Sequence, residues 1–383
     1  MSTKEIGKRS RLKIGFFHNT YINYRLPLFE RLAGRYDITF YFDEVYPMTA
    51  VSSRRFDYKV LRSLVVSRTY NITVSPTLGP HLLKQKPNLF LGSGMSLFGT
   101  QIAFLISRLT RKPFVLWDET WNPTGSTPRK LMWPLMRALL VRAEAIVVPG
   151  SKAREFVIAA GAKPAKVFVA PNAAQIPTSK EVTFVAEGLR ERFRAGSKKV
   201  VLYFGRLVER KGLSILIEAF ARVQADVKDV FLLVAGDGPF RDEAERKCRI
   251  LAVGDFCFTG FVSEEEKASY LSLADVFVLP SILLGGEVEV WGLVLNEAMS
   301  LAKPVISTDA VGGAYDLITD GVNGYIVKEG DVEALYGRLK KLLTDENAAM
   351  KMGFEAKKTV DEGFTFELMT EGFVQAFHHV IGA

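Results

Sequence analysis

The sequence predicts an α/β protein made of two doubly wound, Rossmann-like domains that face each other across a cleft. Three observations support this prediction. Apolar runs of strand length alternate with helical patterns, small polar or glycine-containing clusters follow several strands, and the 383 residues exceed one ordinary core. Repeated strand–helix units with apolar strands form parallel sheets that helices cover on both faces.

The first half of the chain alternates between expected strands and helices. The strands are expected at 12–19, 37–42, 88–93, 113–119, 145–150 and 166–172. The helices are expected at 23–34, 99–109, 129–143 and 151–161. In the last helix we place Ser151 as the N-cap and Gly161 as the terminal glycine. Segment 44–85 shows no clear pattern.

A second series of strand–helix units follows an aperiodic stretch at 173–182, which we interpret as a linker. Its strands are expected to begin at Val200, Val230 and Val276, with others at 255–260, 304–309 and 325–327. The tail is helical from Asp331 onward and is broken near Gly363. These patterns divide the chain into an N-terminal domain at 1–175, a C-terminal domain at 176–363 and a final helix at 364–383.

Charge is divided unevenly between the two halves. The formal net charge is +8, with a balance of +16 over Met1–Gln175 and −8 over the remaining residues. A basic half favours contact with an anionic membrane surface, nucleic acid or acidic substrate, although a merely soluble basic surface also explains it. Two cysteines exclude a disulfide framework, and no apolar run reaches the length of a membrane span. We therefore expect a cytoplasmic protein.

Two cations follow the strand that begins at Val200. Gly205 and Arg206 end this strand, and Lys211 belongs to the segment Glu209–Gly212 that is expected to open the next helix. Arg206 and Lys211 can therefore project at one point above the sheet, beside the positive end of a helix. A guanidinium fork and a compact ammonium together suit a diphosphate, although two solvated surface cations would give the same pattern.

Two glycines, Gly236 and Gly238, follow the next strand. A ligand can approach the backbone closely at glycine, but a tight turn without a ligand explains this pattern nearly as well.

Glu289 and Glu297 bracket a segment in which a helix is expected to begin near Gly292. The amide groups at the start of this helix, those of residues 292–294, can bind an anionic group. The two carboxylates can accept hydrogen bonds from sugar hydroxyls on either side. As alternatives, Glu289 is a capping carboxylate and Glu297 a solvated helix residue, although apolar neighbours argue against the second.

The three motifs, in this order, resemble the donor-binding half of the GT4 family of retaining glycosyltransferases, which have the two-domain GT-B architecture. The family pattern is G-R-x(2)-E-[KR]-K-G, then G-x-G-P, then E-x(7)-E around an aromatic-Gly-Leu centre. The resemblance covers about residues 199–327 well and the rest of the chain as architecture only.

The resemblance implies a role for each matching side chain. Arg206 and Lys211 would hold the donor diphosphate and stabilise the leaving nucleoside diphosphate. Glu289 would bind hydroxyls of the transferred sugar, and these three residues are the expected catalytic group. Glu297 would accept from the ribose hydroxyls.

Further positions complete the donor site that the resemblance implies. The expected main-chain contacts are Gly205, Gly238, Gly292, Leu293 and Val294, with Val262 beside the base. The final helix, which Thr365 and Phe366 precede, would cross back to the N-terminal domain.

The N-terminal domain departs from the family pattern. Many relatives have a Gly-Gly loop after the first strand and a His after the strand equivalent to 113–119. Here Asn19, Tyr21 and Arg25 occupy the first loop, and Glu119 lies where the His is absent. We take these four residues as candidates for the acceptor side, with a buried salt bridge as an equal alternative for Glu119. No Asp-x-Asp triplet or clustered His and Cys occurs, so no metal or other cofactor is expected.

Segment 129–142 mixes basic, aromatic and aliphatic side chains, a composition typical of a helix that lies in a membrane interface. A core helix with a basic outer edge explains it equally well, and Pro134 interrupts the period. If the first interpretation holds, the protein can lie on the inner face of the membrane.

These observations lead to the hypothesis of a retaining glycosyltransferase. It would move a sugar from a nucleoside-diphosphate donor to a hydroxyl of a lipid-linked or polysaccharide acceptor, in cell-envelope glycan or glycolipid synthesis. Front-face attack and double displacement both remain open, although the sequence supplies no convincing nucleophile for the second. The alternatives are a GT-B-type phosphorylase, a nucleotide-sugar epimerase, or a nucleic-acid-binding module, which would leave Glu289 and Glu297 unexplained. We expect no nucleic-acid partner.

Overall fold

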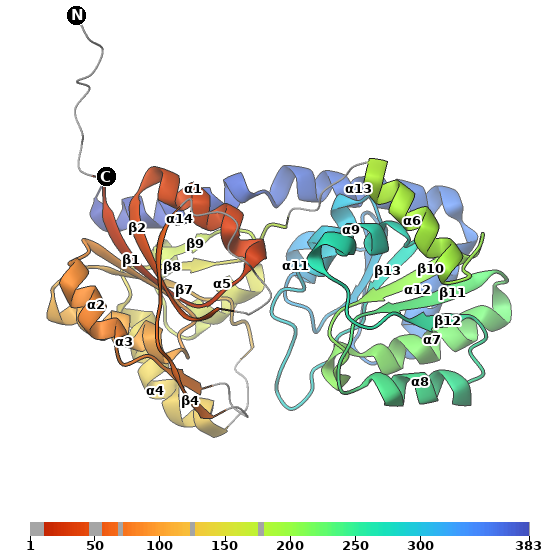
Figure 1. Cartoon of the computed structure of the whole chain (residues 1–383), viewed down its shortest axis with the longest axis horizontal. Helices are drawn as coiled ribbons and strands as arrows, with labels where there is room; N and C mark the ends of the chain where they lie inside the picture. The colour runs from red at the N-terminus through yellow and green to blue at the C-terminus, as the bar shows by residue number, and fades with distance from the viewer. Residues whose placement is uncertain (1–10, 46–55, 68–71, 123–126, 175–179, 383) are drawn as a thin grey trace, which may run out of the picture.

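The computed structural model describes residues 11–45, 56–67, 72–122, 127–174 and 180–382. The chain forms two lobes, the N-terminal one drawn red to yellow and the C-terminal one green to blue (Figure 1). Much of the linker predicted at 173–182, including the boundary between 175 and 176, lies outside the described residues.

The N-terminal lobe contains a seven-stranded parallel sheet in the order β3-β2-β1-β6-β7-β8-β9. Its strands are β1 Lys13–Tyr21, β2 Asp37–Val45, β3 Asp57–Val60, β6 Leu89–Ser93, β7 Phe114–Trp117, β8 Ala145–Val148 and β9 Val167–Val169. The hairpin β4 Leu64–Ser67 with β5 Ile72–Val74 lies within the segment that showed no sequence pattern.

The C-terminal lobe contains a six-stranded parallel sheet in the order β12-β11-β10-β13-β14-β15. Its strands are β10 Lys199–Phe204, β11 Val230–Ala235, β12 Phe256–Phe258, β13 Val276–Leu279, β14 Val305–Thr308 and β15 Tyr325–Val327. Both sheets confirm the predicted fold class. The strand order reverses between β10 and β13, and ligands of such sheets bind at the carboxyl ends of the strands beside this switch point.

Helices cover both faces of each sheet, because strands with apolar residues on both sides must be shielded from water on both faces. On the N-terminal sheet, one face packs against α1 Leu26–Arg35 and α14 Phe366–Ile381. The other face packs against α2 Leu78–Gln85, α3 Phe98–Leu109, α4 Thr127–Arg142 and α5 Ser151–Ala159. Helix α14 comes from the far end of the chain and lies across the N-terminal lobe (Figure 1).

The C-terminal sheet is covered in the same way. One face packs against α6 Lys180–Arg192, α9 Glu264–Ser272, α10 Val294–Ser300, α11 Ala314–Leu317 and α13 Glu346–Gly363. The other packs mainly against α7 Leu213–Asp226, α8 Arg241–Ile250 and α12 Val332–Thr344. Successive residues of a strand alternate between the two cores, so that Val201 and Tyr203 face one core and Val200 and Leu202 the other.

Two local predictions are corrected. Residues Glu209–Lys211 form a separate 3-10 turn, and α7 begins only at Leu213, because Gly212 adopts a positive φ of 69° between them. Ser151 is the first residue of α5 instead of its N-cap, which is Gly150.

The two lobes meet through polar contacts at α5 and α11. The Asp316 carboxylate accepts hydrogen bonds from the amide of Ser151 at 3.0 Å and from its hydroxyl at 3.1 Å. The Lys152 ammonium lies 4.4 Å from the centre of the Tyr315 ring. The side-chain carboxylate of Asp316, in the C-terminal domain, therefore caps a helix of the N-terminal domain.

Candidate active site

Cations after β10 and a carboxylate after β13 meet at the switch point of the C-terminal sheet. Glu289 forms ion pairs with Lys211 and with Arg210, whose Nη1 lies 3.2 Å from Glu289 Oε2. The Lys211 and Glu289 side chains are only 14% and 15% exposed, so solvent screens their attraction weakly. Arg210 also lies 3.8 Å from Glu287. Residues separated by almost 80 positions are therefore joined in one charged cluster.

Gly212 permits this meeting. A Cβ atom at Gly212 would lie 1.8 Å from the Pro280 carbonyl oxygen, so only glycine lets the turn after β10 approach the segment after β13. The amide of Ile282 then donates to the carbonyl of Arg210 at 2.8 Å, which fixes the two segments together.

The side chain of Arg206 is exposed and forms no ion pair with a described residue. Its carbonyl oxygen accepts a hydrogen bond from the Tyr203 hydroxyl at 3.0 Å, which holds its main chain at the exit of β10. The role of Arg206 beside Lys211 stays a prediction. Arg210, which the sequence analysis passed over, makes the second contact with Glu289 in its place.

Glu297 is buried in α10 and is not the solvated residue that one alternative required. Its Oε1 lies 3.0 Å from the Lys267 ammonium of α9, which also lies 2.7 Å from Glu264. Burial raises the pKa of the Glu297 carboxyl, and the charge of Lys267 only partly offsets this. Burial lowers the pKa of Lys267, but the negative charges of Glu297 and Glu264 outweigh the effect of burial, so the pKa is raised. Lys267 therefore compensates the charge of a carboxylate that is buried inside the domain.

A second polar cluster lies at the carboxyl ends of the N-terminal strands. The buried Arg25 guanidinium donates to Glu119 Oε1 at 2.6 Å and to Asn172 Oδ1 at 2.7 Å, and it stacks 4.9 Å from the Trp117 ring. Asn172 Nδ2 also donates to Glu119 at 3.2 Å. Glu119 is thus part of a salt bridge, the alternative that the sequence analysis left open.

The C-terminal half of this arrangement matches a known family. Residues 187–359 match the family described as "Glycosyl transferases group 1". Over this segment the chain is similar to group 1 glycosyl transferases. The segment contains both cations of the first motif and both glutamates of the last, which were the residues that carried the resemblance at the sequence level.

Proteins similar to this chain act on varied molecules, according to their names. The chain is 28% identical to the sulfoquinovosyl transferase SQD2 of Arabidopsis thaliana over 84% of its length and 61% of the relative's. It is 34% identical to a GDP-mannose-dependent phosphatidylinositol monomannoside mannosyltransferase of Mycolicibacterium smegmatis over 43% of its length and 44% of the relative's. The chain thus spans about half the length of such relatives.

Solved structures share the fold of the whole chain. HepE of Anabaena, crystallised with UDP, superposes with a TM-score of 0.78 at 19% identity and covers 95% of this chain and 99% of its own. Sucrose-phosphate synthase of Thermosynechococcus elongatus superposes with a TM-score of 0.72 at 18% identity and covers 97% and 100%. This similarity confirms the GT-B architecture with two Rossmann-like domains.

The other donor-side residues predicted in segment 187–359 follow the carboxyl ends of β10, β11, β12 and β13. The amides of residues 292–294, at the start of α10, donate no hydrogen bond to any described residue. Gly238 packs so closely that an added Cβ would lie 2.3 Å from the Leu207 carbonyl oxygen, and the amide of Gly205 donates to Ala235. Val262 is buried after β12. The structure thus explains Gly238 by packing within the chain, and its contact with a donor stays a prediction.

Two acceptor-side predictions in the first loop are affected by the length of β1, which runs on to Tyr21. Tyr21 is corrected: it is 1% exposed and packs against Phe42, because β1 runs on to it and its ring joins the core that contains Ile14 and Phe16. Asn19 is half-buried within the same strand. The neighbouring His18 is buried, and burial with the nearby Arg25 charge lowers its pKa to about 3, so it is neutral.

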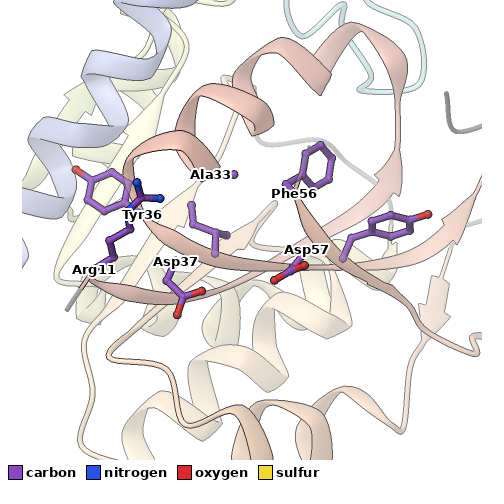
Figure 2. Close-up of a pocket in the computed structure, with 8 residues that line it drawn as sticks. Arg11, Ala33, Tyr36, Asp37, Phe56 and Asp57 are labelled. Carbon is purple, nitrogen blue, oxygen red and sulfur yellow. The ribbon is translucent and has the colours of Figure 1, made fainter. Parts of the chain in front are cut away.

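A pocket of about 820 Å³ lies elsewhere, at the amino ends of β2 and β3 (Figure 2). Arg11, Tyr36, Asp37 and Asp57 line it. Because the charged cluster lies at carboxyl ends of strands, this pocket is not the donor site. Among the described residues, no group of three or more His, Cys, Asp or Glu could hold a metal ion. None of the described helices is long and apolar enough to cross a membrane.

Proposed function

We propose that this protein is a retaining glycosyltransferase. It would move a sugar from a nucleoside-diphosphate donor to a hydroxyl of a lipid-linked or polysaccharide acceptor. The observation that carries this proposal is the contact of Lys211 and Arg210 with Glu289 at the switch point of the segment that is similar to group 1 glycosyl transferases. This transfer needs cations that stabilise the leaving diphosphate and a carboxylate that holds the sugar hydroxyls.

Each charged group has a defined part in the proposal. The ammonium of Lys211 and the guanidinium of Arg206 would neutralise the charge that develops on the leaving diphosphate, so the reaction would need no metal ion. Without a donor, Lys211 is neutralised by Glu289. Donor binding would place the diphosphate on Lys211 and leave the Glu289 carboxylate to accept from the sugar. Glu297 would accept from the ribose hydroxyls.

The names of relatives support an acceptor in glycolipid or envelope glycan synthesis. They include a phosphatidylinositol monomannoside mannosyltransferase and a lipopolysaccharide core glycosyltransferase of Rhizobium meliloti, which is 32% identical over 46% of this chain and 48% of its own length. Acceptors of this kind are lipid-linked, which agrees with the basic N-terminal half. We therefore place the reaction on the cytoplasmic face of a membrane.

A surface of α4 supports this placement. Leu131 is 81% exposed, and Met132 and Leu135 are exposed beside it with Lys130 on the same helix. Residues Met136, Leu139 and Leu140, further along the same helix, belong to the core. The buried residues fit the interpretation as a core helix, and the exposed apolar side chains would suit a bilayer interface. The side chain of Arg129 lies outside the described residues.

The first experiment is a thermal-shift screen against nucleoside diphosphates and their sugar conjugates, because a ligand that binds the native state raises its unfolding temperature. The best donor is then used in transfer assays with lipid-linked acceptors. We expect Lys211→Ala to lower turnover by at least about a hundredfold without changing the unfolding temperature of the free protein by more than a few degrees. Glu297→Ala should lower turnover as strongly, and it should also lower the unfolding temperature because it leaves the buried Lys267 without this partner.

Glu333→Ala is the matched control, since it removes an exposed carboxylate of the same domain that pairs with Arg222. It should leave transfer unchanged. Turnover by Lys211→Ala at the wild-type rate would overturn the site assignment, and donor cleavage without any acceptor would favour a phosphorylase or epimerase instead.

A further inference from the structure

The main chain at Glu289 accepts a hydrogen bond from a side chain of the other domain. Glu289 lies in the connection between β13 and α10, outside any helix or strand. Its amide donates to the Ala310 carbonyl at 3.1 Å, and its carbonyl oxygen accepts from the Gly312 amide at 2.9 Å. The same oxygen also accepts from the indole Nε1 of Trp121, an N-terminal residue, at 3.0 Å.

Packing fixes the indole in this place. A Cβ atom on Gly312 would lie 2.5 Å from Trp121 Nε1, so the ring is seated directly against that glycine. Trp121 also meets Tyr315 of α11 in an edge contact with ring centres 6.3 Å apart. The packing of the indole against Gly312 and Tyr315 therefore supports its hydrogen bond to Glu289.

The other end of the same segment is also bound to the N-terminal domain. Asn296, which precedes Glu297, donates from Nδ2 to the Asn172 carbonyl at 2.9 Å and accepts from Trp291 Nε1 at 2.9 Å. Asn172 belongs to the cluster of Arg25 and Glu119. Residues 289–296 thus span the distance between two anchors, and both anchors are on the opposite domain.

We propose that Trp121 is a positioning residue for the donor sugar, which holds Glu289 in place from the N-terminal domain. This inference rests on the proposed function, because it gives Glu289 the sugar hydroxyls as its ligand. Its consequence is that the donor-sugar carboxylate is held more firmly while the two domains are in contact than when they separate. The nucleotide side of the donor is independent of Trp121, since Glu297 is held by Lys267 within one domain.

The test uses the full chain and the variant Trp121→Phe, which keeps an aromatic ring and removes the N–H donor. Binding of UDP and UDP-glucose, and of GDP and GDP-mannose, is measured by calorimetry. In the pair that the wild-type protein binds, we expect affinity for the sugar conjugate to fall about tenfold and affinity for the free diphosphate to change by less than about twofold. Trp133→Phe, on α4, is the control and should alter neither.

A loss that affects the free diphosphate as strongly as its conjugate would overturn the inference, and so would unchanged affinity for both. Hydrogen exchange supplies a readout that needs no ligand. The amides of Glu289 and Gly312 should exchange faster in Trp121→Phe than in the wild-type protein, while those of β10 and β13 should not change.

The two proposals fail in different ways. If the wild-type protein binds none of the four nucleotides but Trp121→Phe still accelerates exchange at Glu289, the donor assignment is wrong and the anchoring of Glu289 by Trp121 holds. If exchange at Glu289 is unchanged while the wild-type protein binds a donor, the positioning role of Trp121 is wrong and the proposed function holds.

Discussion

Glu297 shows how the surroundings of a carboxylate decide what it can do. Burial raises its pKa, and Lys267 at 3.0 Å only partly restores the charged form. A protonated Glu297 loses acceptor capacity toward ribose hydroxyls. As the pH falls through the raised pKa, affinity for a nucleoside diphosphate should fall, by up to about tenfold per pH unit. This decline should begin at a higher pH than an ordinary glutamate would give, and titration calorimetry at successive pH values measures it.

Glu297→Gln is the control for this prediction, because its amide does not titrate while the nucleotide titrates as before. The variant should bind more weakly at neutral pH and show only the pH dependence of the nucleotide itself. Lys267→Met should move the decline to still higher pH, since it removes the compensating charge. Identical pH profiles for the wild-type protein and Glu297→Gln would remove Glu297 from the nucleotide site.

The sequence predicts some of these residues well and others not at all. The carboxyl ends of parallel strands converge, so the meeting of Lys211 and Glu289 at one site followed from their places after two strands, but their ion pair was not predicted. Lys267 carried one signal, a lysine inside the mostly apolar stretch 267–274, but nothing in that pattern named Glu297 as its partner. Trp121 and Asn172 act across a domain interface, which no local period encodes.

At the scale of elements, strands with strong apolar runs were predicted closely, and short or polar elements were missed. Helix α6 lies in a polar stretch next to the expected linker, and among its side chains that the structure describes, Ala186 and Leu189 reach the core. The hairpin of β4 and β5 exposes Leu64 and Val65, so it lacks the one-sided burial that gives strands their alternation.

Helix α4 gives the prediction that belongs to this scale. Leu131 and Leu135 are exposed, so the double variant Leu131→Glu with Leu135→Glu should fold normally. If α4 inserts into a bilayer interface, each leucine contributes on the order of 1 kcal/mol or more, and the variant should lose at least about tenfold in binding to vesicles with anionic lipid. Cosedimentation with vesicles that contain phosphatidylglycerol measures this loss.

Leu109→Glu is the matched control, since Leu109 is 77% exposed on α3. It should bind vesicles as the wild-type protein does. Equal loss in this control would mean a general effect of charge, and no loss in the α4 variant would exclude the helix as the docking surface. Charge removal at Arg137 is less informative, because its Nε donates to the Ala160 carbonyl at 3.0 Å.

The whole molecule joins its two ends in one core. The N-terminal sheet is covered on one face by α14, whose Phe366, Met369, Phe373 and Phe377 are at most 5% exposed among residues of β1, β6 and β8. Phe373 meets Trp117, and Phe377 meets Tyr36, with ring centres 5.2 and 5.3 Å apart. The first half of the chain therefore does not contain all of its own core, because the final helix crosses back and completes it.

This arrangement predicts that the N-terminal domain depends on α14. Four buried side chains at about 1.5–3 kcal/mol each amount to as much as a typical domain's whole stability. A chain that ends at Gly363 should therefore lose the N-terminal transition in calorimetry and expose the amides of β1 and β8 to exchange, while the C-terminal sheet stays protected. Phe373→Ala should lower the free energy of unfolding of the N-terminal domain by about 3–5 kcal/mol. Leu368→Ala, on the exposed face of α14, should have little effect. Retention of both transitions after truncation would show that α14 covers the N-terminal domain without stabilising it.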